Sequence, residues 1–339
     1  IKSEPGPVRF ASALQGWEQQ EAGSFEIFVP LHLRRLAHTV KTAAAHIRIN
    51  RDGPALHPGP RRYCRSWIRD GVVMGAALLR VGCTDALRDF IRWYGGFQAD
   101  DGTIPDCTDS EGSEWLPEYD AYGQLIFGVM EYYRFTGDRL FLEEMLPAVA
   151  RTLGCMENLR AQRLTEEYLQ PGKQACYGLL PESMSHEGYM AHPVHAYWDD
   201  FWAICGYRDA ASMVEVLGDQ YEAARLKHEH DSLIKNVQAS LAAAIAQHGI
   251  DFLPGSVELG DFDPTAIAVA VGLLDQLEIL PAAETRRTFE KYFDRLTKNK
   301  DIFLVADLAD LKRQPDLQAR LAGFAIFAEG EGYIIDDLQ

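Results

Sequence analysis

Gly178-Leu-Leu-Pro-Glu-Ser-Met-Ser-His-Glu-Gly-Tyr-Met-Ala-His-Pro-Val-His-Ala-Tyr-Trp-Asp-Asp-Phe-Trp202 is a polar and aromatic loop that runs into an apolar segment. Its first half cannot lie inside a helix, because Pro181, Gly188 and Pro193 interrupt it. Its second half begins the apolar run Trp198–Cys205, which predicts the start of a helix. The loop therefore delivers side chains to a helix N-terminus.

The side chains in this stretch are of the kinds that bind sugars. It carries the carboxylates Glu182, Glu187, Asp199 and Asp200 among histidines and aromatic residues. Carboxylates hydrogen-bond to hydroxyl groups and exchange protons with them, while the C–H faces of a sugar ring stack on aromatic rings. The stretch therefore predicts a carbohydrate site.

The same arrangement recurs along the chain. Apolar helices with little charge are predicted near Asp70, Asp120, Asp199 and Asp263, and each follows a polar loop and precedes a more charged amphipathic helix. A helix that is apolar all round must be buried, and an amphipathic helix can cover it. We therefore predict an all-α fold, an (α/α)6 toroid with apolar helices inside, and all long loops at one end.

The predicted toroid does not account for the whole chain of 339 residues. Residues 1–24 have the composition of an irregular lead-in, and residues 25–339 are predicted to form a single domain. Four hairpins are clear, together with a partner helix at 31–49. Because residues 300–339 match no further hairpin, we expect a toroid that is incomplete or divergent at its C-terminal end.

Charge and hydropathy exclude two classes of partner. The chain has 33 basic and 50 acidic residues, a net charge of −17. Such an acidic protein is a poor partner for nucleic acid or an anionic membrane. No apolar run approaches the ~20 residues of a membrane span. We expect a carbohydrate as the partner, and the oligomeric state stays open.

The six cysteines form no CxxC pair, so we expect reduced thiols and favour the cytoplasm, with a secreted or periplasmic location still open. His186, His192 and His195 do not have the spacing of a standard metal signature. We therefore predict no metal and no cofactor.

Two segments resemble the six-hairpin (α/α)6 glycosidases. Ser66-Trp-Ile-Arg-Asp-Gly71 resembles the Trp-x-Arg-Asp segment of the glucoamylase family. Tyr197-Trp-Asp-Asp-Phe-Trp202 is similar to the Trp-Glu-Glu of glucoamylases and to the Trp-Asp of trehalases and processing α-glucosidases. Asp101–Pro105 and Gly178–Glu182 are similar to loops of glycogen-debranching-like sequences. The resemblance covers roughly residues 60–275.

The resemblance implies roles for particular residues. The acid after the tryptophan is the general acid in those families, which implies that role for Asp199. Their Arg-Asp pair holds the hydroxyls of a terminal glucose, which implies that role for Arg69 and Asp70. Their base comes from the last quarter of the fold, where Glu329 and Glu331 are candidates. We assign Asp199, Glu331 and Glu182 to the catalytic set.

The expected substrate-binding residues share the loops and helix starts at the predicted active end. They are Trp67, Arg69, Asp70, Trp115, Asp120, His186, Glu187, Tyr197, Trp198, Asp200, Glu258 and Asp261. Each also has a purely structural interpretation. Asp199 and Asp263 suit helix caps, Arg69 and Asp70 suit an ion pair, and the tryptophans suit a core.

We predict a glycoside hydrolase that acts on a glucoside or oligosaccharide with inversion, through a general acid and a general base. A helix dipole would lower the pKa of Asp199, but burial among aromatic residues would raise it, as a general acid requires. Three alternatives stay open. They are a disaccharide phosphorylase, a sugar epimerase or isomerase that relies on histidines, and a non-catalytic carbohydrate-binding protein.

Overall fold

The computed structural model describes residues 11–12, 15, 27–186 and 188–298. Its helices are α2 (Arg34–Ile49), α3 (Ile68–Arg80), α4 (Asp85–Gly95), α5 (Asp120–Thr136), α6 (Arg139–Ala161), α7 (Tyr197–Leu217), α8 (Gln220–His248), α9 (Pro264–Gly272) and α10 (Ala282–Lys298). Its strands are β1 (Arg51–Asp52), β2 (Ala55–Leu56), β3 (Ser66–Trp67), β4 (Cys107–Thr108) and β5 (Ser113–Glu114). Short 3-10 turns, η1–η5, lie at Leu31–Leu33, Arg61–Tyr63, Glu166–Leu169, Gln174–Cys176 and Leu277–Ile279.

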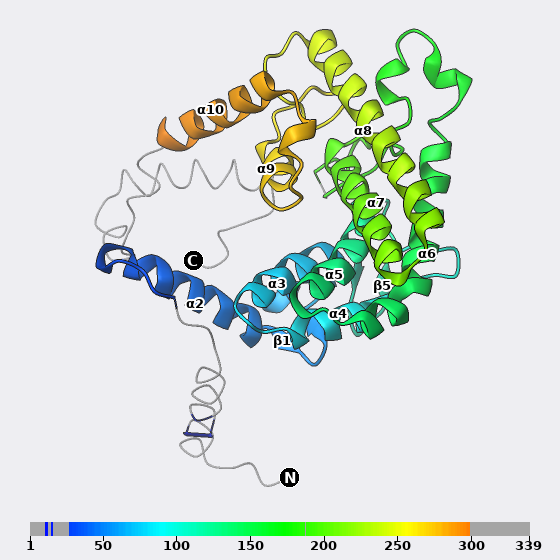
Figure 1. Cartoon of the computed structure of the whole chain (residues 1–339). Helices are drawn as coiled ribbons and strands as arrows, with labels where there is room; N and C mark the ends of the chain where they lie inside the picture. The colour runs from blue at the N-terminus through cyan, green and yellow to red at the C-terminus, as the bar shows by residue number, and fades with distance from the viewer. Residues whose placement is uncertain (1–10, 13–14, 16–26, 187, 299–339) are drawn as a thin grey trace.

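The helices form hairpins that follow one another along an arc. Figure 1 shows this arc running from α2, in blue, to α10, in orange. Helices α3, α5, α7 and α9 pack on one another in chain order, and each also packs on the helix that follows it, α4, α6, α8 or α10. The inner helices begin at or beside the predicted positions. The prediction of an all-α, toroid-like fold is confirmed.

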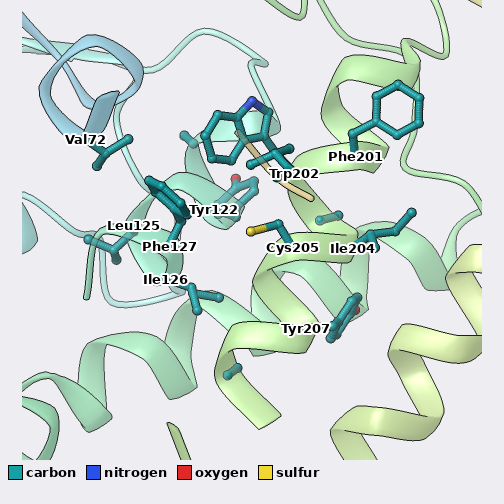
Figure 2. Close-up of a cluster of buried hydrophobic side chains, with 14 of the residues drawn as sticks. Val72, Tyr122, Leu125, Ile126, Phe127, Phe201, Trp202, Ile204, Cys205 and Tyr207 are labelled. Carbon is teal, nitrogen blue, oxygen red and sulfur yellow. The ribbon is translucent and has the colours of Figure 1, made fainter. Parts of the chain in front are cut away.

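The inner helices α5 and α7 form the centre of the core. Both are buried on nearly every side over their first turns, which accounts for their apolar sequences. Figure 2 shows Phe127 of α5 and Trp202 of α7 in this cluster. Their rings meet edge to face with centroids 5.6 Å apart. Val72 of α3 lies in the same cluster, so one apolar core joins three inner helices.

Small residues allow α5 and α7 to cross closely. A Cβ atom placed on Gly123 would lie 2.1 Å from the carbonyl oxygen of Trp202, and one on Gly206 would lie 3.1 Å from the Cα of Gly123. Only hydrogen atoms fit between the two backbones at this point. The crossing therefore fixes how the start of α7 lies against the start of α5.

The outer helices are amphipathic and are capped at their ends. In α4, for example, Leu87, Phe90, Ile91 and Tyr94 are buried on one face, at helical spacing. Asp138 caps α6 and Asp219 caps α8 through backbone N–H groups. These caps place sharp turns at the end of the molecule opposite the long loops.

Short strands connect the loops that precede the inner helices. β3, directly before α3, pairs with β4, and β4 pairs with β5, all antiparallel. Each strand has two residues, too few for any alternation in the sequence to reveal them. The small sheet ties the loop before α3 to the loop before α5, so it helps to hold the N-termini of those two helices together.

Part of the chain lies outside this description. The segment 300–339, and the lead-in 1–24 except for 11–12 and 15, are not among the described residues. Within the described residues, α2 and the four hairpins α3–α4, α5–α6, α7–α8 and α9–α10 account for the fold. No helix in this part of the chain combines the length and the apolar character that a membrane crossing needs.

Candidate active site

The N-termini of the four inner helices meet at one end of the molecule. Arg69 of α3 lies 3.0 Å from Asp120, the first residue of α5. Trp198 of α7 donates to the same carboxylate over 2.7 Å. His186, in the loop before α7, lies 2.9 Å from Asp263, the cap of α9. These contacts confirm the prediction that the loops before the inner helices lie at one end of the molecule.

Asp120 is the centre of this group. It is 1% exposed, and its Oδ2 accepts hydrogen bonds from Arg69 Nη1, Gln124 Nε2 and Trp198 Nε1 at 3.0, 2.7 and 2.7 Å. Three donors satisfy a buried carboxylate that would otherwise be costly to desolvate. Asp120 thus joins α3, α5 and α7 around one charge.

Arg69 is held by two carboxylates. Its Nη1 donates to Glu118 Oε2 at 3.1 Å as well as to Asp120. Burial lowers the pKa of Arg69, but Asp120 and Glu118 outweigh it and raise the pKa, so the guanidinium stays charged. Asp70, the predicted partner, lies half-buried in the first turn of α3, and its negative charge also raises the pKa of Arg69. Glu118 was not among the predicted site residues; it lies in the loop two residues before α5.

Asp199 lies buried at the start of α7 and is 1% exposed. Its two oxygens accept hydrogen bonds from Ser183 Oγ at 2.5 Å and Ser185 Oγ at 3.0 Å. Burial, and then the charge of Asp120, raise its pKa to about 8, although the serine hydroxyls act in the opposite direction. The carboxyl group therefore holds a proton at neutral pH, which is the state that a general acid needs.

Asp200 points away from this group. Its Oδ1 accepts the backbone N–H of Leu180 at 3.0 Å, and the residue is fully buried. Its Oδ2 has no hydrogen-bond partner among the described residues. Burial raises its pKa to about 7, with the Leu180 N–H and then Arg160 acting against the shift. Asp200 therefore fixes the backbone of the loop at Leu180, and it has a structural contact here rather than the predicted substrate contact.

His186 and Asp263 form a half-buried pair beside Trp198. Asp263 caps α9 through the N–H groups of Thr265 and Ala266, as predicted, and also binds His186 Nε2. The ring of His186 meets the indole of Trp198 edge to face with centroids 5.0 Å apart. Burial lowers the pKa of His186, but Asp263 outweighs it and raises the pKa. Burial raises the pKa of Asp263, but His186 outweighs it and lowers the pKa.

A second polar cluster lies along the same loop. Arg163 donates from Nε to His195 Nε2 at 2.9 Å and also pairs with Glu182. His195 Nδ1 lies 2.6 Å from Glu258 Oε1, and the His195 N–H donates to Glu258 Oε2 at 3.0 Å. Since Nε2 accepts from Arg163, the network assigns the proton of the neutral ring to Nδ1. Glu182 and Glu258 therefore belong together, in a cluster separate from Asp120.

Tyr119 is the residue before α5, and its ring stacks on that of Tyr122 with centroids 6.4 Å apart. Burial raises the pKa of its hydroxyl. Arg163 and His195 of the second cluster were not among the predicted site residues. Arg163 follows the end of α6 rather than beginning an inner helix, and its sequence neighbours carry no motif.

The other predicted residues lie in varied surroundings. Asp261 accepts from Tyr189 Oη at 2.7 Å and Ser256 Oγ at 2.6 Å, in the loop before α9. Tyr197 is buried, with its hydroxyl 2.8 Å from Ser240 Oγ of α8, so its place is in the core. Trp115 is 48% exposed and Trp67 is half-buried. Glu187 and Glu331 lie outside the described residues.

The chain was compared with known proteins. No family model matches it, and no curated protein matches it. Among solved structures, it is similar to a glycosidase solved with glucose (TM-score 0.53, 13% identity, 76% of this chain and 69% of that one). It is similar to a rhamnosidase from Klebsiella oxytoca with rhamnose bound (TM-score 0.53, 14% identity, 74% and 47%). It is also similar to a GH78 family rhamnosidase of Bacillus sp. GL1 (TM-score 0.54, 15% identity, 84% and 30%).

These similarities establish the fold. The chain shares its fold with part of each of these glycosidases, and the predicted resemblance to a glycosidase fold is confirmed at that level. The narrower resemblance to the glucoamylase and trehalase group stays a prediction. The chain spans less than half of the length of both rhamnosidases.

Proposed function

We propose that the protein is a glycoside hydrolase that acts on a glucoside or oligosaccharide with inversion. The observation that carries this proposal is the state of Asp199. Its carboxyl group is buried, holds a proton at neutral pH and lies at the end of the toroid where the inner helices begin. A protonated carboxylic acid at such a position is suited to protonate a leaving glycosidic oxygen.

Arg69 and Asp120 support the proposal from the facing helices. A charged guanidinium and a buried carboxylate, fixed within 3.0 Å of each other, can hold adjacent sugar hydroxyls in a set orientation. Trp198 ties Asp120 to the residue next to Asp199. A sugar bound by Arg69 would thus be positioned relative to the acid by a continuous set of hydrogen bonds.

The acid is covered by the loop before α7. Ser183 and Ser185 occupy both oxygens of Asp199. Ser185 also adopts a φ of 51°, a conformation that non-glycine residues seldom hold. For a glycosidic oxygen to reach Asp199, one of the serine contacts must open. The mechanism therefore includes a movement of this loop when substrate enters.

The second carboxylate would activate water on the opposite face of the sugar, ~6.5–9.5 Å from the acid. Glu331 is the candidate from the segment beyond the described residues. Glu182 is the candidate within them. Its side chain is 43% exposed and pairs with Arg163. Partial burial raises its pKa, but its hydrogen bonds and the basic groups beside it outweigh burial and lower the pKa, so it is ionised as a base requires.

One observation favours a second candidate, a sugar epimerase or isomerase. His186 is paired with Asp263 and lies against Trp198, so an imidazole of raised pKa faces the same end of the molecule. Such a pair can move a proton to and from a carbon next to a carbonyl. An epimerase would convert a free sugar and would leave glycosidic bonds intact.

The test is a panel of α- and β-linked glucosides, rhamnosides and disaccharides, with and without phosphate, followed by NMR of the released sugar. Phosphate-independent release of the inverted anomer is the expected result, and it should be lost in Asp199→Asn. Asp231→Asn, which alters an exposed aspartate on the outer helix α8, is the control variant.

Release only with phosphate would indicate a phosphorylase. Interconversion of free sugars would indicate an epimerase, and tryptophan fluorescence changes without turnover would indicate a binding protein.

A further inference from the structure

Three segments of the chain bring a thiol, an imidazole and a carboxylate to one point. Cys176 ends the short turn η4, His195 lies just before α7, and Glu258 lies in the loop before α9. Cys176 Sγ, a ring nitrogen of His195 and a carboxylate oxygen of Glu258 lie within 4.8 Å of one another. The sulfur lies 4.0 Å from Glu258 Oε1, and His195 Nδ1 lies 2.6 Å from that same oxygen.

We propose that these three residues bind a zinc-class divalent cation. Thiolate, imidazole and carboxylate are the ligand types that Zn²⁺ takes in proteins, and three of them leave a fourth tetrahedral position for water. A thiolate ligand argues against Mg²⁺ and Ca²⁺, which prefer oxygen ligands. The three ligands are separate from the Asp120 and Asp199 group. Glu182, the candidate base of the proposed hydrolase, lies beside His195, but binding of the cation does not require hydrolase activity.

The ring of His195 is oriented for this role. Arg163 approaches Nε2, so Nδ1 is the nitrogen that faces Glu258 and can bind the ion. When Nδ1 binds a cation, its proton must move to Nε2, and Arg163 Nε must turn away. Glu182 Oε2 lies 3.8 Å from Nε2 and would accept that N–H after a small shift toward the ring. A carboxylate behind a metal-bound histidine is the usual arrangement around zinc.

The proton balance of binding follows from these states. Because Arg163 donates to Nε2, the ring proton of His195 lies on Nδ1, and on binding it only moves to the other nitrogen. Glu258 accepts the ring N–H and the backbone N–H of His195 with its carboxylate oxygens. Cys176 must lose its thiol proton to become a ligand. Binding of a cation should therefore release the thiol proton of Cys176.

The site is open to the solvent on one side. The side chain of Glu258 is 38% exposed and Cys176 is partly exposed, while His195 is 2% exposed. An ion can thus arrive from solvent and bind against a ligand that is already fixed. Once bound, it would link η4 to both loops that lead into α7 and α9.

Cobalt(II) and zinc titrations of the full chain, first stripped with a chelator, test the proposal. We expect one Co²⁺ per chain with a near-ultraviolet thiolate-to-cobalt charge-transfer band, and displacement of that Co²⁺ by Zn²⁺. Zn²⁺ calorimetry in buffers of different ionisation enthalpy should show that binding releases protons. Absence of the charge-transfer band in the wild-type chain would overturn the proposal.

Variants locate the site. Cys176→Ser should lose the band, whereas Cys64→Ser, which alters an exposed cysteine outside the cluster, should keep it. Glu258→Gln should weaken Zn²⁺ binding at least about tenfold, and Glu182→Gln by about 10–100-fold, as expected for a residue that supports a ligand. Glu182→Gln changes an exposed side chain, so it keeps the test decisive if Cys176→Ser fails to fold. Unchanged affinity in both glutamate variants, or a band that survives in Cys176→Ser, would refute the site.

Discussion

The indole N–H of Trp198 donates to Asp120 over 2.7 Å, and this bond joins the first turns of α7 and α5. Trp198 is the residue before Asp199, so the bond fixes the backbone that carries the proposed acid. Asp120 in turn holds Arg69. The position of the acid relative to the proposed sugar-binding arginine thus depends on one shared carboxylate.

Replacing Trp198 with phenylalanine should uncouple the two helices. The change removes a buried hydrogen bond to a charged acceptor, so we expect a loss of about 1.5–3 kcal/mol in the free energy of unfolding. Urea unfolding followed by circular dichroism measures this loss. Trp93→Phe, in the outer helix α4, is the control, because none of the described hydrogen bonds involves its indole. Equal effects of the two changes would show that the bond to Asp120 contributes nothing specific.

The pH dependence of activity should reveal Asp199. Its pKa is raised from 3.8 to about 8, so the active protonated acid is present below about pH 8 and is lost above it. We expect hydrolysis to fall as the pH rises through about 8. A profile of kcat/KM against pH, measured on any substrate found in the panel, provides the test. Activity that rises through this range would exclude Asp199 as the acid.

The same shift has a consequence for stability. Between pH 3.8 and about 8 the folded chain holds a proton on Asp199 that the unfolded chain has lost. The free energy of unfolding therefore receives a contribution that is fully present below pH 3.8 and declines as the pH rises through about 8. Asp199→Asn should remove this contribution and flatten the curve. Urea unfolding of both proteins across this range measures the difference, and parallel curves would contradict the shift.

Ser183 and Ser185 should tune the acid. Both hydroxyls donate to Asp199 and lower its pKa, against the larger effect of burial. Replacing both serines with alanine removes donors that favour the charged form, so the pKa should rise further. The alkaline limb of the pH profile should then move to higher pH. A shift to lower pH would show that the serines do not stabilise the carboxylate.

Arg69→Ala should be strongly destabilising. It leaves the buried carboxylates of Asp120 and Glu118 without their cation, and breaking a buried pair in this way costs about 3–5 kcal/mol. Arg92→Ala is a matched control, because Arg92 pairs with Glu144 at the exposed surface and should lose at most about 1 kcal/mol. Chemical denaturation of both variants gives the comparison. Similar losses would mean that the Arg69 cluster is solvated.

Gly123→Ala tests the helix crossing. The new Cβ would lie 2.1 Å from the carbonyl oxygen of Trp202, so α5 and α7 must separate, and we expect a loss of about 1–3 kcal/mol or more. Gly154→Ala on α6 is the control, because its Cβ would meet no atom within 4 Å. That change should be neutral or stabilise the helix by about 0.5–1 kcal/mol. Thermal and urea unfolding of both variants measure these effects.

The architecture could be predicted because the positions of apolar residues in a helical sequence show which sides of the helix are buried. α5 and α7 are apolar on all sides where other helices surround them, and α4 is apolar on one face only. The convergence of Asp120, Asp199 and Asp263 also followed, since each stands at the start of an inner helix. Sequence position alone was enough to place these three residues at the same end.

The partners of those residues could not be predicted in the same way. Glu118, Arg163 and Ser183 reach the site from loops, where no periodicity indicates which way a side chain points. Glu182 lies close to Asp199 in the sequence, yet its cation is Arg163, from the end of an outer hairpin. Cys176 gave no signal, because its potential co-ligands are distant in the chain and form no spaced motif.

All four inner helices point their N-termini at the same end, and each N-terminus carries roughly half a positive charge from its aligned peptide dipoles. Asp70, Asp120, Asp199 and Asp263 stand on these positive ends. The backbone therefore acts as a fixed counterion that lets a strongly acidic chain gather so many carboxyl groups in one place without many lysines or arginines. If the hairpins ran in the opposite sense, the same acids would lie at negative helix ends, which would disfavour their charged forms.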